Sequence, residues 1–311
     1  MKFTILVAAY NAKDYLERCL DSLLAQTEKS VQIICIDDHS TDDSLALQQK
    51  YTKEKGCILV IQTPENQGQA EARNLGLKYA VGELTMMVDA DDWLAPDCLE
   101  RIWEAYKEAD DIDAVMMRLM MVEGKNVREW NNPAALPHVM TGKNACLLAL
   151  RRQVHGLYAV RTEIHKKYPF DTTARLYSDD NTTYAHYLSS RKVVQSQGIY
   201  YYRQHATSMT HQMGLTRLMF LEANMSLRQL LENMDAGDDA RSLCEDYCWK
   251  NFQSIYCRMQ KYKRDNMLTA DETEKIDTTL ARAYEALKLE RIGKRKWNYG
   301  IYRGVRRLVM R

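Results

Sequence analysis

Glycine is scarce at the start of this 311-residue chain, where the first one is Gly56. No G-x-G-x-x-G turn follows the first apolar segment, and the chain contains no G-x-x-x-x-G-K-[ST] loop. Both motifs use glycine so that backbone amides can approach and hold phosphate. Their absence argues against dinucleotide-dependent hydride transfer and against P-loop hydrolysis.

Long hydrophobic segments and an excess of one charge are also missing. The N-terminal apolar run, residues 3–9, is too short for a signal peptide and far too short to span a bilayer. We therefore expect a cytoplasmic protein. The formal net charge of +1 gives no overall reason to expect a nucleic-acid or membrane partner.

Paired cysteine motifs are absent as well. The eight cysteines are scattered without a C-x-x-C spacing. Several occupy apolar positions of expected strands or helices, so we interpret them as buried reduced thiols rather than disulfides or zinc ligands. Cys244 and Cys248 share a helix face, but no histidine or further cysteine lies at zinc-finger spacing.

The first 120 residues alternate regularly between strand and helix patterns. Continuous apolar runs predict strands at 3–9, 31–36, 57–62, 84–88 and 114–122. Apolar residues at helical spacing predict the intervening helices, at about 16–24, 42–56, 69–81 and 96–109. This order indicates an α/β fold whose mostly parallel sheet is covered by helices on both faces.

The remainder of the chain is less regular. A polar segment at 123–137 predicts a loop or a small hairpin, and the patterns that follow predict a helix at 142–152, a strand at 157–161, a helix after Asp180 and a strand at 198–203. Residues 215–289 contain one glycine and no proline, and their composition is typical of helices. We expect a helical C-terminal region.

Acidic residues gather where two predicted strands end. Asp37 and Asp38 follow the second strand, and Asp89, Asp91 and Asp92 follow the fourth. Open parallel sheets bind ligands beyond the carboxyl ends of their strands. Like charges about 4 Å apart repel by roughly 4 kcal/mol at an effective dielectric near 20, so a cation should compensate them. Mg²⁺ or Mn²⁺ would suit these oxygen ligands and could bridge to phosphate.

Four motifs in this order resemble the family 2 glycosyltransferases, which have the GT-A fold. They are AAYN at 8–11, DDHSTDDS at 37–44, NQGQAEARNLG at 66–76 and DADDW at 89–93. SDDNTTY at 178–184 and YYYRQHATSMTH at 200–211 resemble the acceptor half of bacterial members. The resemblance implies a catalytic domain over 1–213, with a nucleotide-sugar-binding half at 1–120 and an acceptor-binding half at 121–213. Residues 214–311 would form the helical C-terminal region with a basic amphipathic tail.

The resemblance also implies how a nucleotide-sugar donor would bind. Tyr10 would lie beside the base, Asp38 would accept a hydrogen bond from a pyrimidine N–H, usually of uracil, and Asp89 would contact the ribose. Asp91 would coordinate the metal on the diphosphate. Arg73 would lie near the base or phosphates, although an ion pair with Glu71 or a sheet-end aspartate is an alternative. The other expected donor contacts are Ala8, Asn11, Asn66, Gly68, Ala90 and Arg203.

For catalysis, the resemblance implies an acidic pair ahead of a helix, here Asp179 and Asp180. Asp180 would be the general base that takes the acceptor's proton, although it could also merely cap the helix. The family usually has Glu as the first member of this pair, where this chain has Asp179. Attack opposite the leaving group would invert the anomeric centre, and we expect no covalent nucleophile.

Three further positions have two interpretations each. His211 lies in a segment that resembles a loop closing over the diphosphate, so it is either a second metal ligand or an ordinary surface histidine. Asp92 either contacts ligand or caps the helix near Pro96. Trp93 packs either on an acceptor sugar or in the core.

The C-terminal tail, residues 291–311, contains eight Lys and Arg residues, no acid, and interleaved aromatic and aliphatic residues. Such a segment can lie on an anionic membrane surface, and we favour this reading because acceptors in bacterial glycan pathways are often lipid-linked. A solvated basic helix that packs on the domain, or an RNA-binding patch, are the alternatives.

We therefore expect an inverting hexosyl- or N-acetylhexosaminyl-transferase that uses a UDP-sugar with Mn²⁺ or Mg²⁺. The acceptor would be a glycan or lipid-linked glycan of a bacterial surface polysaccharide, and the long helical C-terminus leaves room for a homodimer. A sugar nucleotidyltransferase is one alternative, but it usually needs a glycine-rich loop after the first strand. A non-catalytic nucleotide-binding relative is another, and the presence of every acidic motif argues against it.

Overall fold

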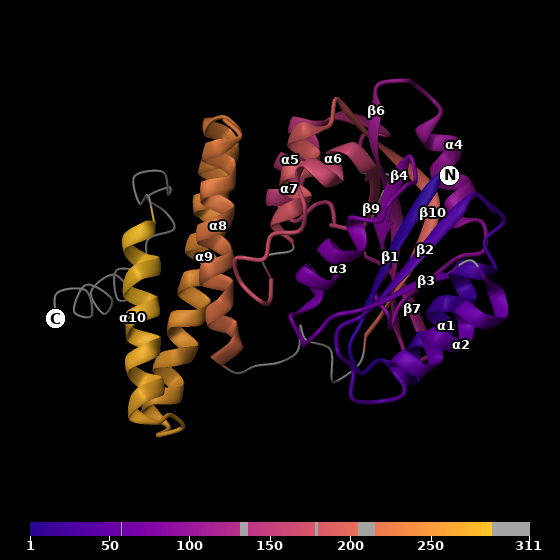
Figure 1. Cartoon of the computed structure of the whole chain (residues 1–311). Coiled ribbons are helices and arrows are strands. Elements are labelled where there is room, and N and C mark those ends of the chain that lie inside the picture. The colour runs from indigo at the N-terminus through magenta and orange to yellow at the C-terminus, as the bar shows by residue number, and fades with distance from the viewer. Residues whose placement is uncertain (57, 131–135, 178–179, 205–214, 288–311) are drawn as a thin grey trace.

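The computed structural model describes residues 1–56, 58–130, 136–177, 180–204 and 215–287 (Figure 1). It has the expected α/β architecture with a helical C-terminal part. The strands are β1 (Phe3–Ala9), β2 (Val31–Asp37), β3 (Ile58–Gln62), β4 (Leu84–Met87), β5 (Trp93–Leu94), β6 (Ile112–Glu123), β7 (Asn126–Glu129), β8 (Val139–Thr141), β9 (Tyr158–Arg161) and β10 (Lys192–Arg203).

Helices follow most of these strands. They are α1 (Lys13–Leu24), α2 (Ser44–Lys55), α3 (Gln69–Leu77), α4 (Cys98–Tyr106), α5 (Gly142–Leu150), α6 (Thr162–Lys167), α7 (Asn181–Ser189), the 3₁₀ helix η3 (Leu215–Leu218), α8 (Met219–Asn233), α9 (Asp238–Arg264) and α10 (Ala270–Ala286). Helix α2 ends at Gly56, whose φ of +67° lies in the left-handed region that favours glycine.

The strands form one sheet in the order β3-β2-β1-β4-β9-β6-β10-β5. Strands β1 to β4 are parallel to one another, as the sequence pattern predicts. The half of the sheet from β9 to β5 is mixed. Strand β9 lies antiparallel between β4 and β6, and the short β5 lies antiparallel beside β10 at the sheet edge. The polar segment after β6 forms the β6–β7 hairpin.

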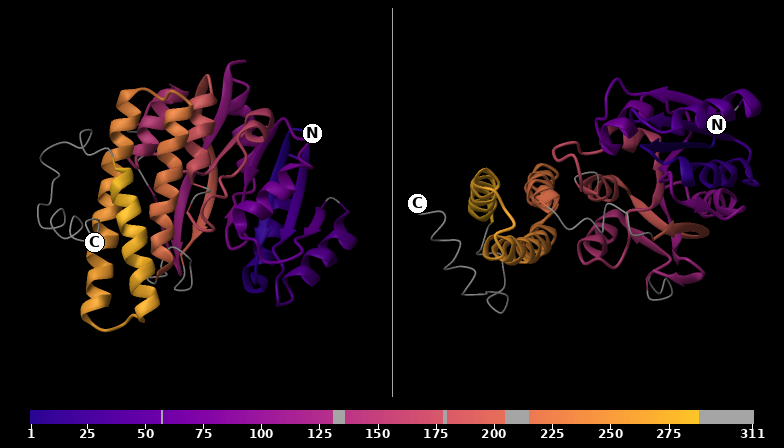
Figure 2. Two further views of the ribbon diagram at one scale, coloured as in Figure 1. Left: turned by 60° about the vertical axis from the view of Figure 1, so that its left-hand side comes forward. Right: turned by 90° about the horizontal axis from the view of Figure 1, so that it is seen from below.

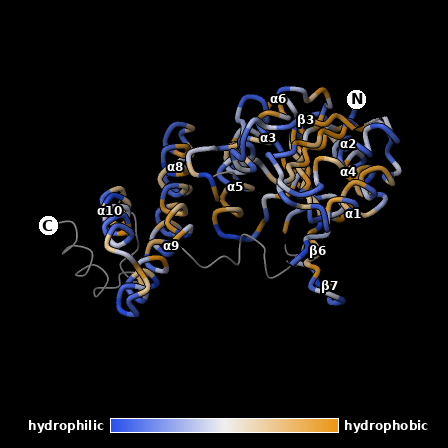
Figure 3. The backbone as a smooth tube through the Cα atoms, turned by 60° about the horizontal axis from the view of Figure 1, so that its bottom comes forward, coloured by the Kyte–Doolittle hydropathy of each residue, from blue (hydrophilic) through white to orange (hydrophobic). Residues whose placement is uncertain are grey.

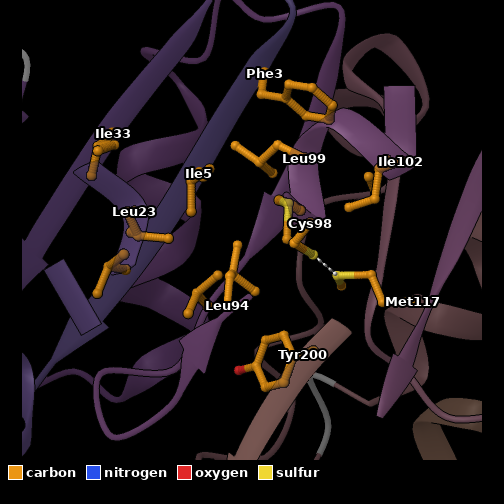
Figure 4. Close-up of a cluster of buried hydrophobic side chains, with 14 of the residues drawn as sticks. Phe3, Ile5, Leu23, Ile33, Leu94, Cys98, Leu99, Ile102, Met117 and Tyr200 are labelled. Atoms are coloured by element: carbon orange, nitrogen blue, oxygen red, sulfur yellow. Dashed lines mark hydrogen bonds between the residues drawn. The ribbon is translucent and has the colours of Figure 1, made fainter. Parts of the chain in front are cut away.

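Hydrophobic side chains cover both faces of the sheet. On one face, alternate residues of β1, including Phe3 and Ile5, pack against α1 and α4 around Leu23 and Leu99 (Figure 4). On the other face, Leu6 and Ile36 pack against α3. The residues of the sheet interior are mainly hydrophobic, whereas hydrophobic and hydrophilic residues are mixed within the turns of α8 and α9 (Figure 3). This pattern is typical of a buried sheet flanked by amphipathic helices.

Helices α8, α9 and α10 pack against one another as a bundle, in which α8 and α9 lie beside α5 and α7 (Figure 1 and Figure 2). They share a core that includes Trp249, Phe252 and Leu280. Gly237, with φ +88°, lies at the turn into α9 and is the glycine noted in this segment of the sequence. Within the described residues, no helix is both long enough and apolar enough to cross a bilayer. The basic tail at 291–311 lies outside those residues.

The cysteines agree with the expected reduced thiols. Six of the described ones are buried, Cys257 is exposed, and none forms a disulfide within the described chain. The Sγ atoms of Cys244 and Cys248 lie 3.7 Å apart in the core between α9 and its neighbours. The hydrogen bond to Cys244 raises the pKa of Cys248, and burial in apolar surroundings, which favours the protonated thiol, raises it further.

Candidate active site

The carboxyl ends of β1, β2 and β4 lie side by side, because β1 pairs in parallel with both of the others. Ala9 is in register with Asp37, and the Asp38 amide donates to the Ala9 carbonyl oxygen at 2.8 Å. Tyr10 follows β1 and is 50% exposed. The sheet therefore brings the residues of the first, second and fourth motifs to one edge, as the sequence predicts.

Asp38 organises the loop at 63–68. Its carboxylate accepts hydrogen bonds from the amides of Gln67 and Gly68 at 2.9 and 2.8 Å, and from the Thr63 hydroxyl at 3.0 Å. Asp38 is buried, and Gly68 has a φ of +94°. In the structure without ligand, this carboxylate therefore shapes the loop that carries Asn66, and a hydrogen bond to a base stays a prediction.

Asn11 has a comparable role on the neighbouring loop. Its φ is +49°, and its side-chain oxygen accepts from the amides of Thr41 and Asp42 at 2.8 and 3.3 Å. Its own amide donates to the Ser40 hydroxyl at 3.1 Å. Asn11 thus joins the turn after β1 to the turn after β2. Ala8, which precedes this turn, is half-buried at the end of β1.

The carboxylates of Asp89, Asp91 and Asp92, here called the acidic triad, each place one oxygen within 4.8 Å of the others. Ala90 lies buried between them in the chain. Arg73, which is 2% exposed on α3, forms an ion pair with Asp89. The structure therefore shows the second alternative for Arg73, an ion pair with an aspartate at the end of the sheet. This guanidinium compensates part of the negative charge of the acidic triad.

Asp92 differs from the other two members of the acidic triad. It is 1% exposed, and its oxygens accept from the Tyr200 hydroxyl and the Arg203 amide, both at 2.7 Å. Burial, together with the charges of Asp89 and Asp91, raises the pKa of Asp92 to about 9. Asp92 does not cap α4, whose N-terminal cap position is Asp97. It joins the acidic triad to β10 instead.

The acidic triad fits a divalent metal of the Mg²⁺ or Mn²⁺ type. Such ions take oxygen ligands, and the described residues that converge here supply only carboxylates. Asp89 and Asp91 are half-buried and can reach a ligand, whereas Asp92 is buried and already engaged. Asp91 and Asp89 would therefore hold the ion. His211, the other expected metal ligand, lies outside the described residues.

Arg203 and Trp93 flank the acidic triad at the sheet edge. The Arg203 Nε donates to the Asp91 carbonyl oxygen at 2.9 Å, and its guanidinium carbon lies 4.9 Å from the Trp93 ring centroid. The Trp93 ring stacks on Tyr201 at 5.3 Å between centroids. Trp93 is 8% exposed, so it is packed in the protein rather than presented openly to solvent.

Asp180 occupies the position before α7 and is exposed. Its carbonyl oxygen accepts from the Thr183 amide at 3.2 Å, but its side chain makes no capping hydrogen bond. The interpretation of Asp180 as a simple helix cap is therefore not what the structure shows. Asp179, the other half of the expected pair, lies outside the described residues.

The loop before Asp180, residues 168–177, reaches the 63–68 loop. Arg175 donates to Asn66, and a Cβ atom on Gly68 would lie 3.2 Å from the Arg175 Cγ. The Asn74 side chain and the Phe170 backbone exchange two hydrogen bonds of 2.8 Å. These contacts tie the segment that carries Asp180 to the predicted donor side.

The same loop is also tied to α8. Asp171 accepts from the Ser226 hydroxyl at 2.5 Å and from the Asn181 side chain at 2.9 Å, and Asn181 also donates to the Ala223 carbonyl oxygen at 2.9 Å. The sequence analysis missed these residues. No local pattern marks them, because each contact joins segments that are far apart in the chain.

Comparisons with known proteins agree with this geometry. The family model of Glycosyl transferase family 2 matches residues 4–169. The chain is 31% identical over 205 residues to poly(ribitol-phosphate) beta-glucosyltransferase of Bacillus spizizenii, over 65% of this chain and 32% of the relative. It is 25% identical to glycosyltransferase GlyA of Streptococcus pneumoniae, over 91% of this chain and 44% of that protein. The chain thus spans less than half the length of both relatives.

Solved structures show the same fold at low identity. A crystal structure of S. aureus TarS 1–349 in complex with UDP-GlcNAc has a TM-score of 0.72 and 20% identity, covering 94% of this chain and 83% of TarS 1–349. The mannosyltransferase PcManGT of Pyrobaculum calidifontis, solved with GDP-Man and Mn²⁺, has a TM-score of 0.56 and 15% identity, covering 99% of this chain and 85% of that one. The expected GT-A fold is confirmed.

Proposed function

The chain belongs to glycosyl transferase family 2, and we propose that its site transfers a sugar from a nucleotide-sugar donor to a hydroxyl group of a glycan or lipid-linked glycan. One observation carries this proposal. The acidic triad, with Arg73 paired to Asp89, lies at the sheet edge beside the Asp38-organised 63–68 loop. A diphosphate and a divalent cation match this combination of carboxylates and a buried guanidinium.

The donor is a UDP-sugar in this proposal. TarS was solved with UDP and with UDP-GlcNAc, and it shares the fold of this chain. Exposed Tyr10 is available to stack on a base beside β1, and the 63–68 loop is held by its hydrogen bonds to Asp38. The Asp89 carboxylate, which is 30% exposed, is available for a ribose hydroxyl or the metal.

Asp91 and Asp89 would hold Mn²⁺ or Mg²⁺. When bound, such an ion stabilises the negative charge that develops on the departing diphosphate. The ion pair with Arg73 fixes Asp89 in place, and Tyr200 and the Arg203 amide hold Asp92 behind them. The protein thereby presents a rigid set of oxygen ligands at the carboxyl edge of the sheet.

Transfer would proceed by one displacement with inversion. The acceptor oxygen forms a bond to the anomeric carbon as the bond from that carbon to the diphosphate oxygen breaks, and the acceptor's proton passes to the Asp180 carboxylate. Asp180 is exposed at the start of α7, and its side chain does not cap the helix. A carboxylate in this position can act as a general base on a hydroxyl group.

The acceptor belongs to a bacterial surface polysaccharide in this proposal. One relative is named for glucosyl transfer to poly(ribitol-phosphate). If the 291–311 tail binds anionic lipid, as its composition suggests, the enzyme would act at the cytoplasmic face of the membrane.

A panel of nucleotide sugars with Mn²⁺ tests the proposal. Thermal stabilisation by one UDP-sugar, with release of UDP when a glycan acceptor is added, is the expected result. Release of pyrophosphate from a sugar phosphate and a nucleoside triphosphate would instead identify a nucleotidyltransferase. Binding of a UDP-sugar without hydrolysis or transfer to any acceptor would favour a non-catalytic relative.

A further inference from the structure

Two arginines share one tryptophan at the edge of the sheet. The guanidinium carbon of Arg18, on α1, lies 3.4 Å from the Trp93 ring centroid, and that of Arg203, at the end of β10, lies 4.9 Å from it. Arg203 also lies 5.1 Å from the Tyr15 ring centroid, and Tyr201 stacks on Trp93. Trp93 and Tyr15 therefore hold the two cations by cation–π contacts, and Tyr201 supports Trp93 by stacking on it.

Within the described residues, neither Arg18 nor Arg203 forms an ion pair with a carboxylate, as other arginines of this protein do. Arg161 pairs with Asp113 and Arg228 pairs with Glu245, and both acids are nearly buried. Over the described part of the chain, no carboxylate lies within 4 Å of the Arg18 or Arg203 guanidinium. Burial and the charge of Arg203 lower the pKa of Arg18, so the pair repels itself where it stands.

The guanidinium groups also retain hydrogen-bond donors. The Nε–H of Arg203 donates to the Asp91 carbonyl oxygen at 2.9 Å, and within the described residues neither group donates a further hydrogen bond. A guanidinium has five N–H donors in a planar arrangement that matches phosphate oxygens. Arg18 is exposed and Arg203 is half-buried, so an anion from solvent can reach both.

We propose that Arg18 and Arg203, framed by Tyr15, Trp93 and Tyr201, form a subsite for a phosphate group of the acceptor. The subsite rests on the proposed glycosyl transfer, and it names the acceptor class as one that carries phosphodiester or phosphate groups near the reacting hydroxyl. A single phosphate held between two guanidiniums would relieve their repulsion and satisfy their free donors.

The position of the subsite favours the acceptor over the donor as the source of this phosphate. The predicted donor motifs follow β1, β2 and β4, in the parallel half of the sheet. Trp93 belongs to β5, the edge strand beside β10, in the mixed half. The Asp91 carbonyl oxygen links the two regions through Arg203, so a phosphate here would lie beside the reaction site rather than within the metal-bound diphosphate.

Direct binding measurements test this subsite. Diglycerol phosphate, a soluble phosphodiester, is titrated into the full chain with saturating Mn²⁺ and UDP, and UDP is titrated separately. We expect Arg18→Ala to weaken phosphodiester binding by about tenfold while the UDP affinity changes less than about twofold. Arg18→Lys should restore part of the binding, because it keeps the charge without the planar donors. Arg101→Ala is the matched control, since Arg101 makes only surface ion pairs on α4.

Each other outcome has a definite meaning. Equal phosphodiester binding by the wild type and Arg18→Ala, or no binding by either, overturns the subsite. A loss of UDP affinity in Arg18→Ala equal to the loss of phosphodiester affinity overturns the assignment to the acceptor. A wild type that binds the phosphodiester through Arg18 but binds no UDP contradicts the proposed function and leaves the anion subsite standing.

Discussion

At the scale of single residues, the three aspartates of the acidic triad have different surroundings. Asp89 is neutralised by buried Arg73, and Asp92 is buried with a pKa raised to about 9. Asp91 has its carboxylate half-buried and its carbonyl oxygen bound by Arg203. Chain spacing alone could not separate them, because Arg73, Tyr200 and Arg203 come from α3 and β10. Asp91 remains the best candidate for the principal metal ligand.

Asp91→Ala should abolish most of the metal's contribution to donor binding. The affinity for UDP in the presence of Mn²⁺ should fall by about tenfold or more, because the ion loses a negatively charged oxygen ligand. The affinity measured with excess chelator should stay unchanged. Calorimetric titration of UDP with and without Mn²⁺ checks both values. Asp97→Ala, which removes a surface acid paired with Arg101 at 3.1 Å, is the control, and an equal metal effect in both variants would contradict the assignment.

Asp180→Asn should separate chemistry from binding. The amide keeps the shape of the side chain but cannot take the acceptor's proton, so the transfer rate should fall by about 10² to 10⁴. UDP affinity should stay within about twofold of the wild-type value. Rates of UDP release with acceptor, beside UDP titrations, measure the two effects. Asp238→Asn, at an exposed acid that begins α9, is the matched control. Transfer at the wild-type rate would remove Asp180 from the mechanism.

At the scale of elements, α8 supports the loop that carries the predicted base. Ser226 and the Ala223 carbonyl oxygen, both on α8, bind Asp171 and Asn181 on either side of Asp180. Tyr177 stacks on Phe220 with ring centroids 3.7 Å apart. The C-terminal helices therefore do more than extend the fold, because they fix the direction from which the 168–177 loop approaches α7.

Ser226→Ala should loosen this support without touching the donor site. The lost hydrogen bond has a charged acceptor, and such bonds contribute about 1.5–3 kcal/mol. We expect the transfer rate to fall by roughly fivefold to tenfold, because Asp180 is held less firmly, while UDP affinity stays the same. Ser254→Ala, at an exposed serine of α9, is the control. A Ser226→Ala variant with weaker UDP binding and a normal rate would show that α8 supports the donor side instead.

The elements themselves were largely predictable because their signals are local. The apolar runs and helical spacings of β1 to β4 and their helices depend on residues within one turn or one strand. The strand predicted at 157–161 is confirmed as β9, but its antiparallel pairing with β4 and β6 was not predicted, and neither was the short β5 beside β10, because these pairings join segments far apart in the chain. The hydrogen bond from Ser226 to Asp171, which joins residues 55 positions apart, escaped prediction for the same reason, whereas α6 escaped it because its six residues are too few to show a helical repeat of apolar positions.

At the scale of the whole molecule, two histidines, His155 and His186, are held as neutral rings by hydrogen bonds in the interior. His155 Nε2 bonds to the Met117 carbonyl oxygen at 2.9 Å, and the Leu157 amide donates to His155 Nδ1 at 3.1 Å. His186 repeats this arrangement between the Tyr168 carbonyl oxygen and the Tyr158 hydroxyl. A carbonyl oxygen can only accept, so in each ring one nitrogen donates and the other accepts.

Protonating these histidines should destabilise the fold. Burial lowers the pKa of both to about 4, below the value of about 6.5 for an unfolded histidine, so between these limits the unfolded chain binds more protons. The free energy of unfolding should therefore fall as the pH drops from 6.5 toward 4, by up to about 3 kcal/mol per histidine. Urea titrations across this range measure the decline.

Carboxylates also lose their favourable charge on acidification and lower the free energy of unfolding. The contribution of the histidines to this decline is therefore measured by comparison with variants that lack them. The double variant His155→Asn with His186→Asn removes both titrating rings, and its unfolding free energy should decline less steeply between pH 6.5 and 4 than that of the wild type. His138→Asn is the control, because His138 is exposed and paired with Glu108 at 2.8 Å, and it should keep the wild-type slope. If the unfolding free energy of all three proteins declined equally with pH, the rings of His155 and His186 would not be held neutral in the folded protein. Only a lowered pKa in the folded state links their protonation to unfolding.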